Sequence, residues 1–402
     1  MNVTMQQLLT FMINQKGSDL HLSADAVPRI RVHGELKPLS MKMLNQEEAT
    51  KLIYSMLNQD QINKLEKTKD LDSSYEIPGV SRFRVNVCYQ RARIRTTVRT
   101  IPTKIMTFEQ LALPMDVFTK ICRIPKGLIL VTGATGSGKS TTLSSMIDYV
   151  NNTRENHIVT IEDPIEFVHQ DKKCMVTQRE IGADTPTFAS ALKHVLRQDP
   201  DIVLIGEMRD RETVQTGLEL SETGHLTFAT LHTSDAVQTI NRIIDIFPPD
   251  QQPQIRTQLG FVLEAVVCQQ LLKTKDGAGR CVALEILLAT QSVRANIRGE
   301  KIHQIYSALQ TGSQIGMTTM NQSLVKLVED GKIDAEAALK NSSRPDELQK
   351  LLGDAYIPAD DALQEIHAAR NNGEMWGAEK AKTQVQQKEN GADKPPSERG
   401  KW

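Results

Sequence analysis

The chain reads Gly133-Ala134-Thr135-Gly136-Ser137-Gly138-Lys139-Ser140 at the point that decides its fold. This is a G-x-x-x-x-G-K-[ST] pattern placed directly after an apolar run, Leu128 to Val131. Glycines at this spacing allow a tight loop whose backbone N–H groups converge on a phosphate, and a following helix adds its positive dipole end. We therefore predict a nucleotide site formed by these eight residues and Thr141. In it Lys139 reaches the β- and γ-phosphates and Ser140 holds Mg²⁺.

Short apolar runs surround this loop, and each has the length of a strand that is buried on both faces. They are residues 128–131, 158–161, 202–205 and 226–231. Helical patterns lie between them, at residues 187–196 and 211–222. Strands that alternate with helices predict a parallel sheet covered by helices on both faces. Ligands bind at the carboxyl edge of such a sheet, so residues that directly follow a strand are site candidates.

Acidic residues follow two of these strands. Glu207 stands just after residues 202–205, and residues 160–166 carry three carboxylates in five positions around Pro164. A nucleotide hydrolase needs one carboxylate to organise Mg²⁺ and a group to position water. We predict Glu207, with Ser140, as a metal ligand, and expect at least one carboxylate of the second cluster to point into the same cleft. An acid after a buried strand is also common surface chemistry, so position alone does not decide between these alternatives.

Two histidines, His225 and His232, flank the run at residues 226–231. Such a strand spans about 20 Å, so strand geometry does not allow both to touch one phosphate. We expect one of them to cap the strand. His232, at the carboxyl end, is the predicted contact to the γ-phosphate.

Composition excludes several classes of protein. Lys and Arg number 48 against 49 Asp and Glu, and aromatic residues are only 4%, which argues against a nucleic-acid partner. The five cysteines form no C-x-x-C pair, so neither a disulfide framework nor a zinc ribbon is indicated. No run reaches the ~18 apolar residues of a membrane span. We expect a cytoplasmic protein with no direct membrane insertion.

The pattern divides the chain into four parts. Residues 1–100 predict a small α+β domain, 101–125 a linker, 126–353 the nucleotide-binding domain and 354–402 a disordered tail. The first domain is expected to contain helices at 5–14 and 47–65, strands at 20–22 and 30–32, and a hairpin at 83–87 and 94–98. Short helices are expected at 108–113 in the linker and at 360–370 in the tail.

Four motifs stand in one order along the chain: GATGSGKS at 133–140, TIEDPIEF at 160–167, IGEMRDRET at 205–213 and GHLTFATLHT at 224–233. Together they resemble the Walker A, Asp, Walker B and His boxes of type II and type IV pilus secretion ATPases. Within that superfamily the chain is most similar to the type IV pilus retraction (twitching motility) ATPases, the PilT family. The resemblance extends over residues 1 to about 352 and includes the stretches at 17–22 and 81–86.

The resemblance implies a homohexamer of two-domain subunits with ATP bound between neighbours. The amino-terminal domain would be PAS-like and the carboxyl-terminal domain a RecA-like P-loop ATPase. Glu166 would polarise the attacking water, Glu207 would be the Walker B acid, and His225 and His232 would be the His-box residues. Arginines from the amino-terminal domain would complete a neighbour's site. Arg84 and Arg99 match best, with a merely basic hairpin face or other arginines as alternatives: Arg82, Arg93 and Arg95.

The implied activity is Mg²⁺-dependent ATP hydrolysis that powers pilus retraction and twitching motility. Its place would be the cytoplasmic face of the inner membrane at the pilus base, with the pilus platform protein as partner and a paralogous retraction ATPase as a further candidate. An extra amino-terminal domain and a four-cysteine zinc site, usual in assembly ATPases, are missing from this sequence, which favours retraction.

Three departures keep alternatives open. The family's AIRNLIRE stretch appears in altered form at 292–299, Ala134 replaces the usual proline, and residues 268–271 read like the accessory paralogue, PilU. The alternatives are an accessory retraction ATPase, an extension or type II secretion ATPase, and a non-hydrolysing regulator of a partner motor.

Overall fold

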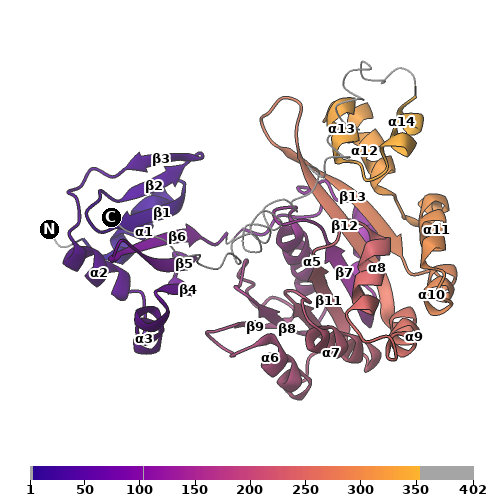
Figure 1. Ribbon diagram of the computed structural model, residues 1–402, viewed down its shortest axis with the longest axis horizontal. Helices are drawn as coiled ribbons and strands as arrows, with labels where there is room; N and C mark the ends of the chain where they lie inside the picture. The colour runs from indigo at the N-terminus through magenta and orange to yellow at the C-terminus, as the bar shows by residue number, and fades with distance from the viewer. Residues whose placement is uncertain (1–2, 103, 354–402) are drawn as a thin grey trace, which may run out of the picture. The chain divides into compact units, whose positions relative to one another are not determined.

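The computed structural model describes residues 3–102 and 104–353 (Figure 1). The tail expected at 354–402, with its short helix, lies outside these residues. The chain divides into two compact units, one made of residues up to Leu271 with Leu284–Thr318 and one made of Leu272–Ala283 with the described residues from Thr319 onward. Within the described ranges, the helices are all too short or too polar to cross a bilayer.

The first hundred residues form a sheet of their own, with six strands in the order β3-β2-β1-β6-β5-β4 and every neighbouring pair antiparallel. Alternating apolar residues such as Leu20, Phe83 and Val85 turn to one face, where three helices share their core. The opposite face is polar. The elements are α1 (Met5–Asn14), β1 (Gly17–Ser23), β2 (Arg29–Val32), β3 (Glu35–Pro38), α2 (Gln46–Tyr54), α3 (Gln59–Thr68), β4 (Asp70–Ile77), β5 (Ser81–Gln90) and β6 (Arg93–Thr100).

The helix predicted at 5–14 is confirmed, but the single helix predicted at 47–65 is wrong. Asn58 interrupts it. Its side chain accepts a hydrogen bond from the backbone N–H of Gln61, and the side-chain oxygen of Gln61 accepts one from the backbone N–H of Asn58, so a new helix begins there. Helical spacing continues across this boundary in the sequence, which hides the break.

The helix predicted at 108–113 is also wrong. Residues 108–112 form a turn in which Thr107 and Gln110 exchange backbone-to-side-chain hydrogen bonds, and Ala112 then takes a left-handed conformation with φ of 54°. The helix of this segment comes later, as α4 (Met115–Cys122), directly after Pro114. A proline at that point is compatible with a helix start and not with a helix interior.

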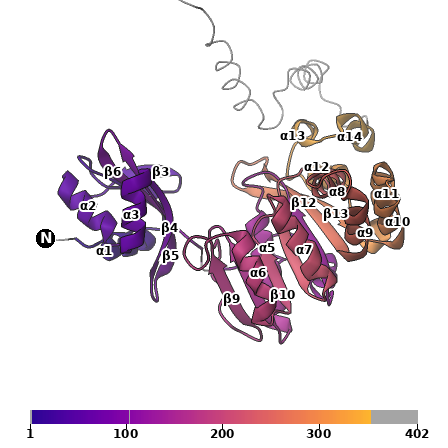
Figure 2. The same cartoon turned by 60° about the horizontal axis from the view of Figure 1, so that its bottom comes forward.

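The second sheet has seven strands in the order β13-β12-β7-β11-β10-β8-β9. All four predicted strands are present, and they are mutually parallel in the order β7-β11-β10-β8. Helices α6 to α9 lie over one face of this sheet (Figure 2) and share its larger core. The elements are β7 (Gly127–Thr132), α5 (Lys139–Thr153), β8 (His157–Glu162), β9 (Met175–Glu180), α6 (Phe188–Val195), β10 (Ile202–Ile205), α7 (Arg211–Glu222), β11 (Leu226–Leu231), α8 (Ala236–Asp245), α9 (Gln252–Val262), β12 (Leu263–Lys273) and β13 (Arg280–Leu288).

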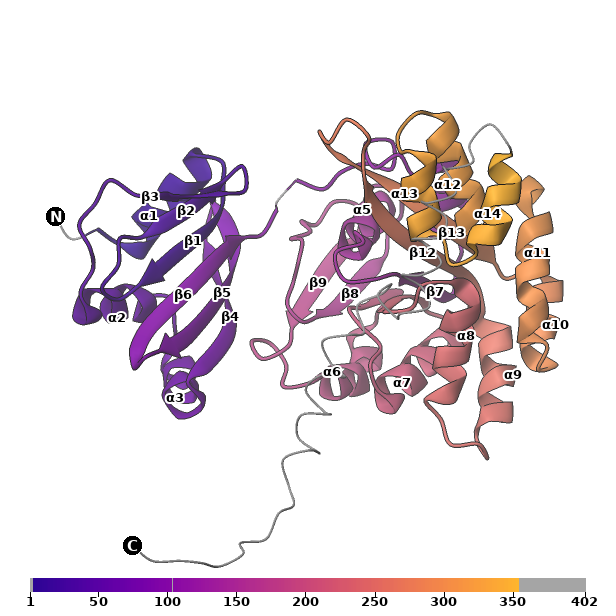
Figure 3. The ribbon, with the colours of Figure 1, turned by 45° about the horizontal axis from the view of Figure 1, so that its top comes forward.

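Helices complete the carboxyl-terminal part of the described chain, where Figure 3 shows them in orange and yellow. The last three pack on a small core of their own that includes Leu324, Leu339 and Leu348. The elements are α10 (Gln291–Arg298), α11 (Ile305–Thr311), α12 (Met320–Glu329), α13 (Ala335–Asn341) and α14 (Pro345–Leu352), with 3₁₀ turns at Leu196–Gln198, Ile302–Gln304 and Ser313–Ile315.

Candidate nucleotide-binding site

The phosphate loop lies where the sequence predicts it, between the end of β7 and the start of α5. Three of its residues have positive φ: Gly133 at 143°, Gly136 at 81° and Gly138 at 91°, and Gly138 is the N-cap of α5. Only glycine takes such angles without strain. The loop conformation therefore requires glycine at these three positions, and it places the open amino end of a helix of 15 residues beside the loop.

Lys139 lies across this loop. Its Nζ donates hydrogen bonds to the backbone oxygens of Gly133, at 2.8 Å, and Ala134, at 3.1 Å. Burial lowers the pKa of Lys139 below its usual value, while the charges of Glu207 and Glu166 act in the opposite direction. One lysine thus interacts with the loop and with the two carboxylates that the sequence singled out.

Glu207 follows β10 and His232 follows β11, and the parallel pairing of these strands brings the two side chains together at the carboxyl edge. His232 Nε2 lies 3.3 Å from Glu207 Oε1. Arg209 forms a two-pronged ion pair with the same carboxylate, from Nε to Oε1 at 2.7 Å and from Nη2 to Oε2 at 2.7 Å. Burial raises the pKa of Glu207, but Arg209 and His232 outweigh burial and hold that pKa below its usual value.

The carboxylates of the acidic cluster after β8 point in different directions. Glu162 turns inward, where its carboxylate accepts hydrogen bonds from Thr160 Oγ1 at 2.7 Å and from Gln178 Nε2 at 3.1 Å. It also accepts the backbone N–H of Glu166 at 3.4 Å, and burial raises its pKa. The side chain of Glu166 is exposed. Glu162 therefore holds the turn, and the exposed Asp163 and Glu166 are the carboxylates left to face solvent or a ligand.

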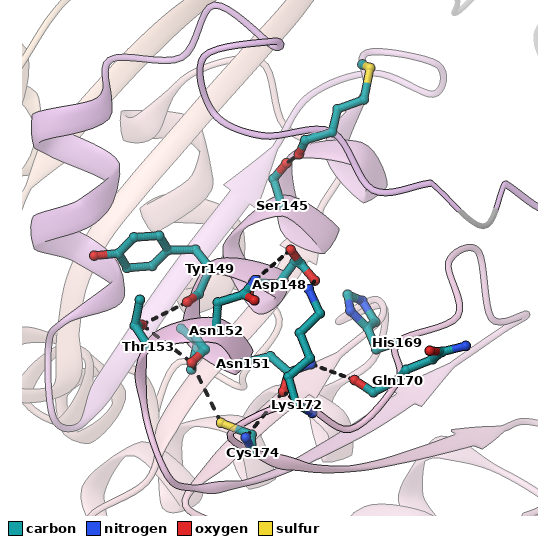
Figure 4. Close-up of polar contacts among 12 residues, drawn as sticks. Ser145, Asp148, Tyr149, Asn151, Asn152, Thr153, His169, Gln170, Lys172 and Cys174 are labelled. Atoms are coloured by element: carbon teal, nitrogen blue, oxygen red, sulfur yellow. Dashed lines mark hydrogen bonds and ion pairs between the residues drawn. The ribbon is translucent and has the colours of Figure 1, made fainter.

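The segment after this cluster is tied to the far half of α5 by a residue that the sequence did not suggest (Figure 4). Asn151 is fully buried; its Oδ1 accepts the backbone N–H groups of Lys172 and Cys174, and its Nδ2 donates to Gln170 O at 2.8 Å. Lys172 also pairs with Asp148 at 2.6 Å. The helix that begins at the phosphate loop thus carries the segment that leaves the acidic cluster. The residues around Asn151 in the sequence give no indication of this role, because its partners lie about 20 residues further along the chain.

His225 does not join the cluster within one chain. It lies before β11, where its Nδ1 faces Leu220 O at 3.0 Å and its backbone oxygen accepts the N–H of Gly127 at the start of β7. That is the amino edge of the sheet, a strand length of about 20 Å from the carboxyl edge. Of the two predicted histidines, His225 caps a strand and His232 reaches the site.

Arg84 and Arg99 are paired across β5 and β6 on the polar face of the first sheet. Arg99 donates from Nε to the buried carboxylate of Asp19 at 2.7 Å, and its side chain is still 65% exposed. Arg84 is exposed as well. Their action on a neighbouring subunit stays a prediction. The alternative arginines also have partners: Ser74 and Glu180 for Arg82, Asp25 for Arg93 and Gln90 for Arg95.

The residues fit a nucleotide with Mg²⁺. A Cβ added to Gly136 would meet open space, so the loop is accessible on that side. Mg²⁺ prefers oxygen ligands, and the hydroxyl of Ser140 in the first turn of α5 and the carboxylate of Glu207 are the groups that would supply them. Thr141 and the first amides of α5 stand beside them.

Comparison with known proteins agrees with this geometry. The family described as type II/IV secretion system protein matches residues 2–340 of the chain. The chain belongs to this family. A protein of Pseudomonas aeruginosa named type IV pilus retraction ATPase PilT is 47% identical over 340 residues, which cover 85% of this chain and 98% of that protein. The type IV pilus ATPase PilU of the same organism is 38% identical, over 86% and 91% of the two chains.

A solved structure supports the fold of this family member over most of its length. The crystal structure of the pilus retraction motor PilT with bound ADP superposes with a TM-score of 0.81 at 46% identity. The match covers 87% of this chain and 99% of that one. The predicted fold class, a RecA-like ATPase fold with an α+β region before it, is confirmed.

Proposed function

We propose that this chain hydrolyses ATP with Mg²⁺ and works as the motor of type IV pilus retraction. The proposal depends on one observation: Lys139, Glu207 and His232 converge beside a phosphate loop whose glycines have positive φ. This site stands in a chain that matches 98% of a named retraction ATPase at 47% identity. The motor would be a homohexamer at the cytoplasmic face of the inner membrane, bound to the pilus platform protein.

Each residue has a defined task in this proposal. The loop amides and Lys139 bind the phosphates, and Ser140 and Glu207 hold Mg²⁺, which supplies positive charge to the phosphate oxygens. Glu166 orients the attacking water, and His232 contacts the γ-phosphate. Arg84 and Arg99 reach the site of the next subunit, where guanidinium groups stabilise charge on the transferred phosphoryl group.

Two sets of contacts in the described state bear on these tasks. The Nζ of Lys139 is bonded to loop carbonyls, and Glu207 is held by both prongs of Arg209. A lysine ammonium has three N–H donors, so Lys139 keeps one for phosphate while it holds the two carbonyls, whereas a carboxylate that holds a metal directly releases at least part of its arginine. Metal binding therefore exchanges existing polar contacts, and the exchange gives the cycle two distinct states of Glu207.

The first experiment is deletion of the gene with pili scored by microscopy, complemented by the wild-type gene or by Glu166→Gln. We expect hyperpiliated, non-twitching cells that only the wild-type gene restores. Bald cells would show an extension motor instead. Purified protein without phosphate release would show a non-hydrolysing regulator.

An accessory, PilU-like role is the second candidate, favoured by the Cys268-Gln269-Gln270-Leu271 stretch and opposed by the lower identity to PilU. The two roles differ in dependence on a paralogue. A primary motor retracts pili in a strain from which other retraction ATPase genes are deleted. An accessory motor fails in that strain and retracts pili only when the other motor is present.

A further inference from the structure

Gln269, on β12, lies directly beneath the phosphate loop, although it is 132 residues away from it in the chain. β12 is the parallel neighbour of β7 and pairs Cys268 with Thr132, so Gln269 comes level with Gly133, where the loop begins. Its side-chain Nε2 donates a hydrogen bond of 2.6 Å to the backbone oxygen of Ser137. The residue is 2% exposed, which shields this bond from water.

The loop glycines pack against the same residue. A Cβ on Gly133 would stand 2.3 Å from the backbone oxygen of Gln269, and a Cβ on Gly138 would stand 3.0 Å from its Nε2. Real Cβ atoms do not approach backbone so closely at Gly133, so the loop rests on Gln269 at its first residue and meets its amide again at its last. Gln269 therefore supports the loop from the side of β12, by packing and by its hydrogen bond.

The hydrogen bond also sets the direction of a loop amide. Among the described residues, the Asp163–Pro164 bond is the only cis peptide, so the bond between Ser137 and Gly138 is trans. In a trans peptide the C=O and the N–H point in opposite directions. Because Gln269 holds the Ser137 oxygen toward β12, the N–H of Gly138 points away from β12.

The glutamine at this position carries a cost as well as a benefit. The Oε1 of Gln269 is buried without a hydrogen-bond partner in the described part of the protein, and a buried unsatisfied carbonyl costs free energy. An apolar side chain of equal length would avoid that cost but would take the donor away from the backbone oxygen of Ser137. What the glutamine gives the protein is therefore the bond to the loop.

We propose that Gln269 is a positioning residue, which holds the phosphate loop in the shape that binds nucleotide. This role rests on the proposed function of the loop as a nucleotide site. It predicts that loss of the Gln269 amide weakens nucleotide binding, because part of the binding free energy is then spent on ordering the loop.

Gln270 is a matched control. It is the next residue on the same strand, so its side chain points to the opposite face of the sheet, away from the loop. Its Oε1 is also buried without a partner among the described residues. Gln270→Met therefore makes the same chemical change one position away, without touching Ser137.

The experiment compares the full-length wild-type, Gln269→Met and Gln270→Met proteins. It measures the Kd and dissociation rate of a fluorescent ADP (MANT-ADP), the KM and kcat for ATP, and the melting temperature without nucleotide. For Gln269→Met we expect a Kd about tenfold higher, mainly through faster dissociation. Tenfold corresponds to about 1.4 kcal/mol, the size of one hydrogen bond. KM should rise more than kcat falls, and Gln270→Met should stay within about twofold.

Three results would overturn the proposal. The first is a Gln269→Met protein with wild-type Kd and dissociation rate, and the second is an equal loss in both variants. The third is wild-type protein that does not bind MANT-ADP, which refutes the proposed function of the loop itself and so is distinguishable from the other two. Gln269→Ala removes the amide without added bulk and replaces the methionine variant if that variant does not fold.

Discussion

A buried histidine makes the stability of the chain depend on pH in a predictable direction. His169 follows the acidic cluster and lies beside Asp148 and Lys172 (Figure 4). It is 8% exposed, and its Nδ1 has no hydrogen-bond partner among the described residues. Burial lowers its pKa to about 4; the charge of Asp148 opposes this effect and that of Lys172 adds to it.

The sign follows from the two pKa values. An unfolded histidine has a pKa of about 6.5. Between pH 6.5 and pH 4 the unfolded chain binds a proton that the folded chain rejects, so stability is full above pH 6.5 and falls as the pH falls. The whole difference is worth about 3 kcal/mol, of which about 2 kcal/mol is already lost at pH 5.

Thermal melting of the wild type and of His169→Gln at pH 8 and pH 5 measures this effect. About 2 kcal/mol lowers the melting temperature of a domain of this size by roughly 4 to 8 °C. Between pH 8 and pH 5, we expect the melting temperature of the glutamine variant to fall by roughly 4 to 8 °C less than that of the wild type. His194→Gln, at an exposed position on α6, is the control and should behave like the wild type. Equal acid losses in the wild type and His169→Gln would refute the argument.

Other predictions concern the site. Glu166→Gln should bind MANT-ADP normally and release phosphate at least about 10² times more slowly, because a positioned base is lost. Near-normal release would show that Glu166 is not the base. Lys139→Ala should instead weaken MANT-ADP binding itself. Arg99→Lys should lower turnover by ~10² without loss of binding, because lysine lacks the guanidinium fork; activity restored by mixing Arg99→Ala with Glu166→Gln subunits would show action in trans. Arg209→Ala should lower the Mg²⁺ concentration for half-maximal activity, measured by Mg²⁺ titration, because Glu207 loses a competitor.

The sequence predicted the phosphate loop and its four central strands because their signals are local. Strands buried on both faces are continuous apolar runs, and the loop needs glycine at positions of positive φ. β9 was missed because it pairs only with β8 at the end of the sheet and its residues are mostly half-exposed and polar. The boundary at Asn58 was missed because capping depends on a side-chain contact that helical spacing does not report.

The sequence did not indicate the roles of residues whose partners lie far away in the chain. Asn151 and Gln269 are polar residues in a helix and a strand, and their roles depend on partners that the fold brings from elsewhere. The resemblance to a family placed Glu166, Glu207 and the arginines, but it gave no contacts for them. It also grouped His225 with His232, whereas the strand between them sends the two to opposite edges of the sheet.

The polar groups of the described site satisfy one another: Lys139 bonds the loop, and Glu207 bonds Arg209 and His232. A metal bound directly to Glu207 must replace part of these contacts, so its measured affinity is the difference between the bonds that it forms and the bonds that it replaces. A residue that touches no ligand then changes affinity by stabilising either set. Arg209 competes for the carboxylate and should weaken metal binding, whereas Gln269 holds the loop open to phosphate and should strengthen nucleotide binding. The two substitutions, Arg209→Ala and Gln269→Met, are therefore expected to shift ligand affinity in opposite directions, although each removes a hydrogen bond from the same site.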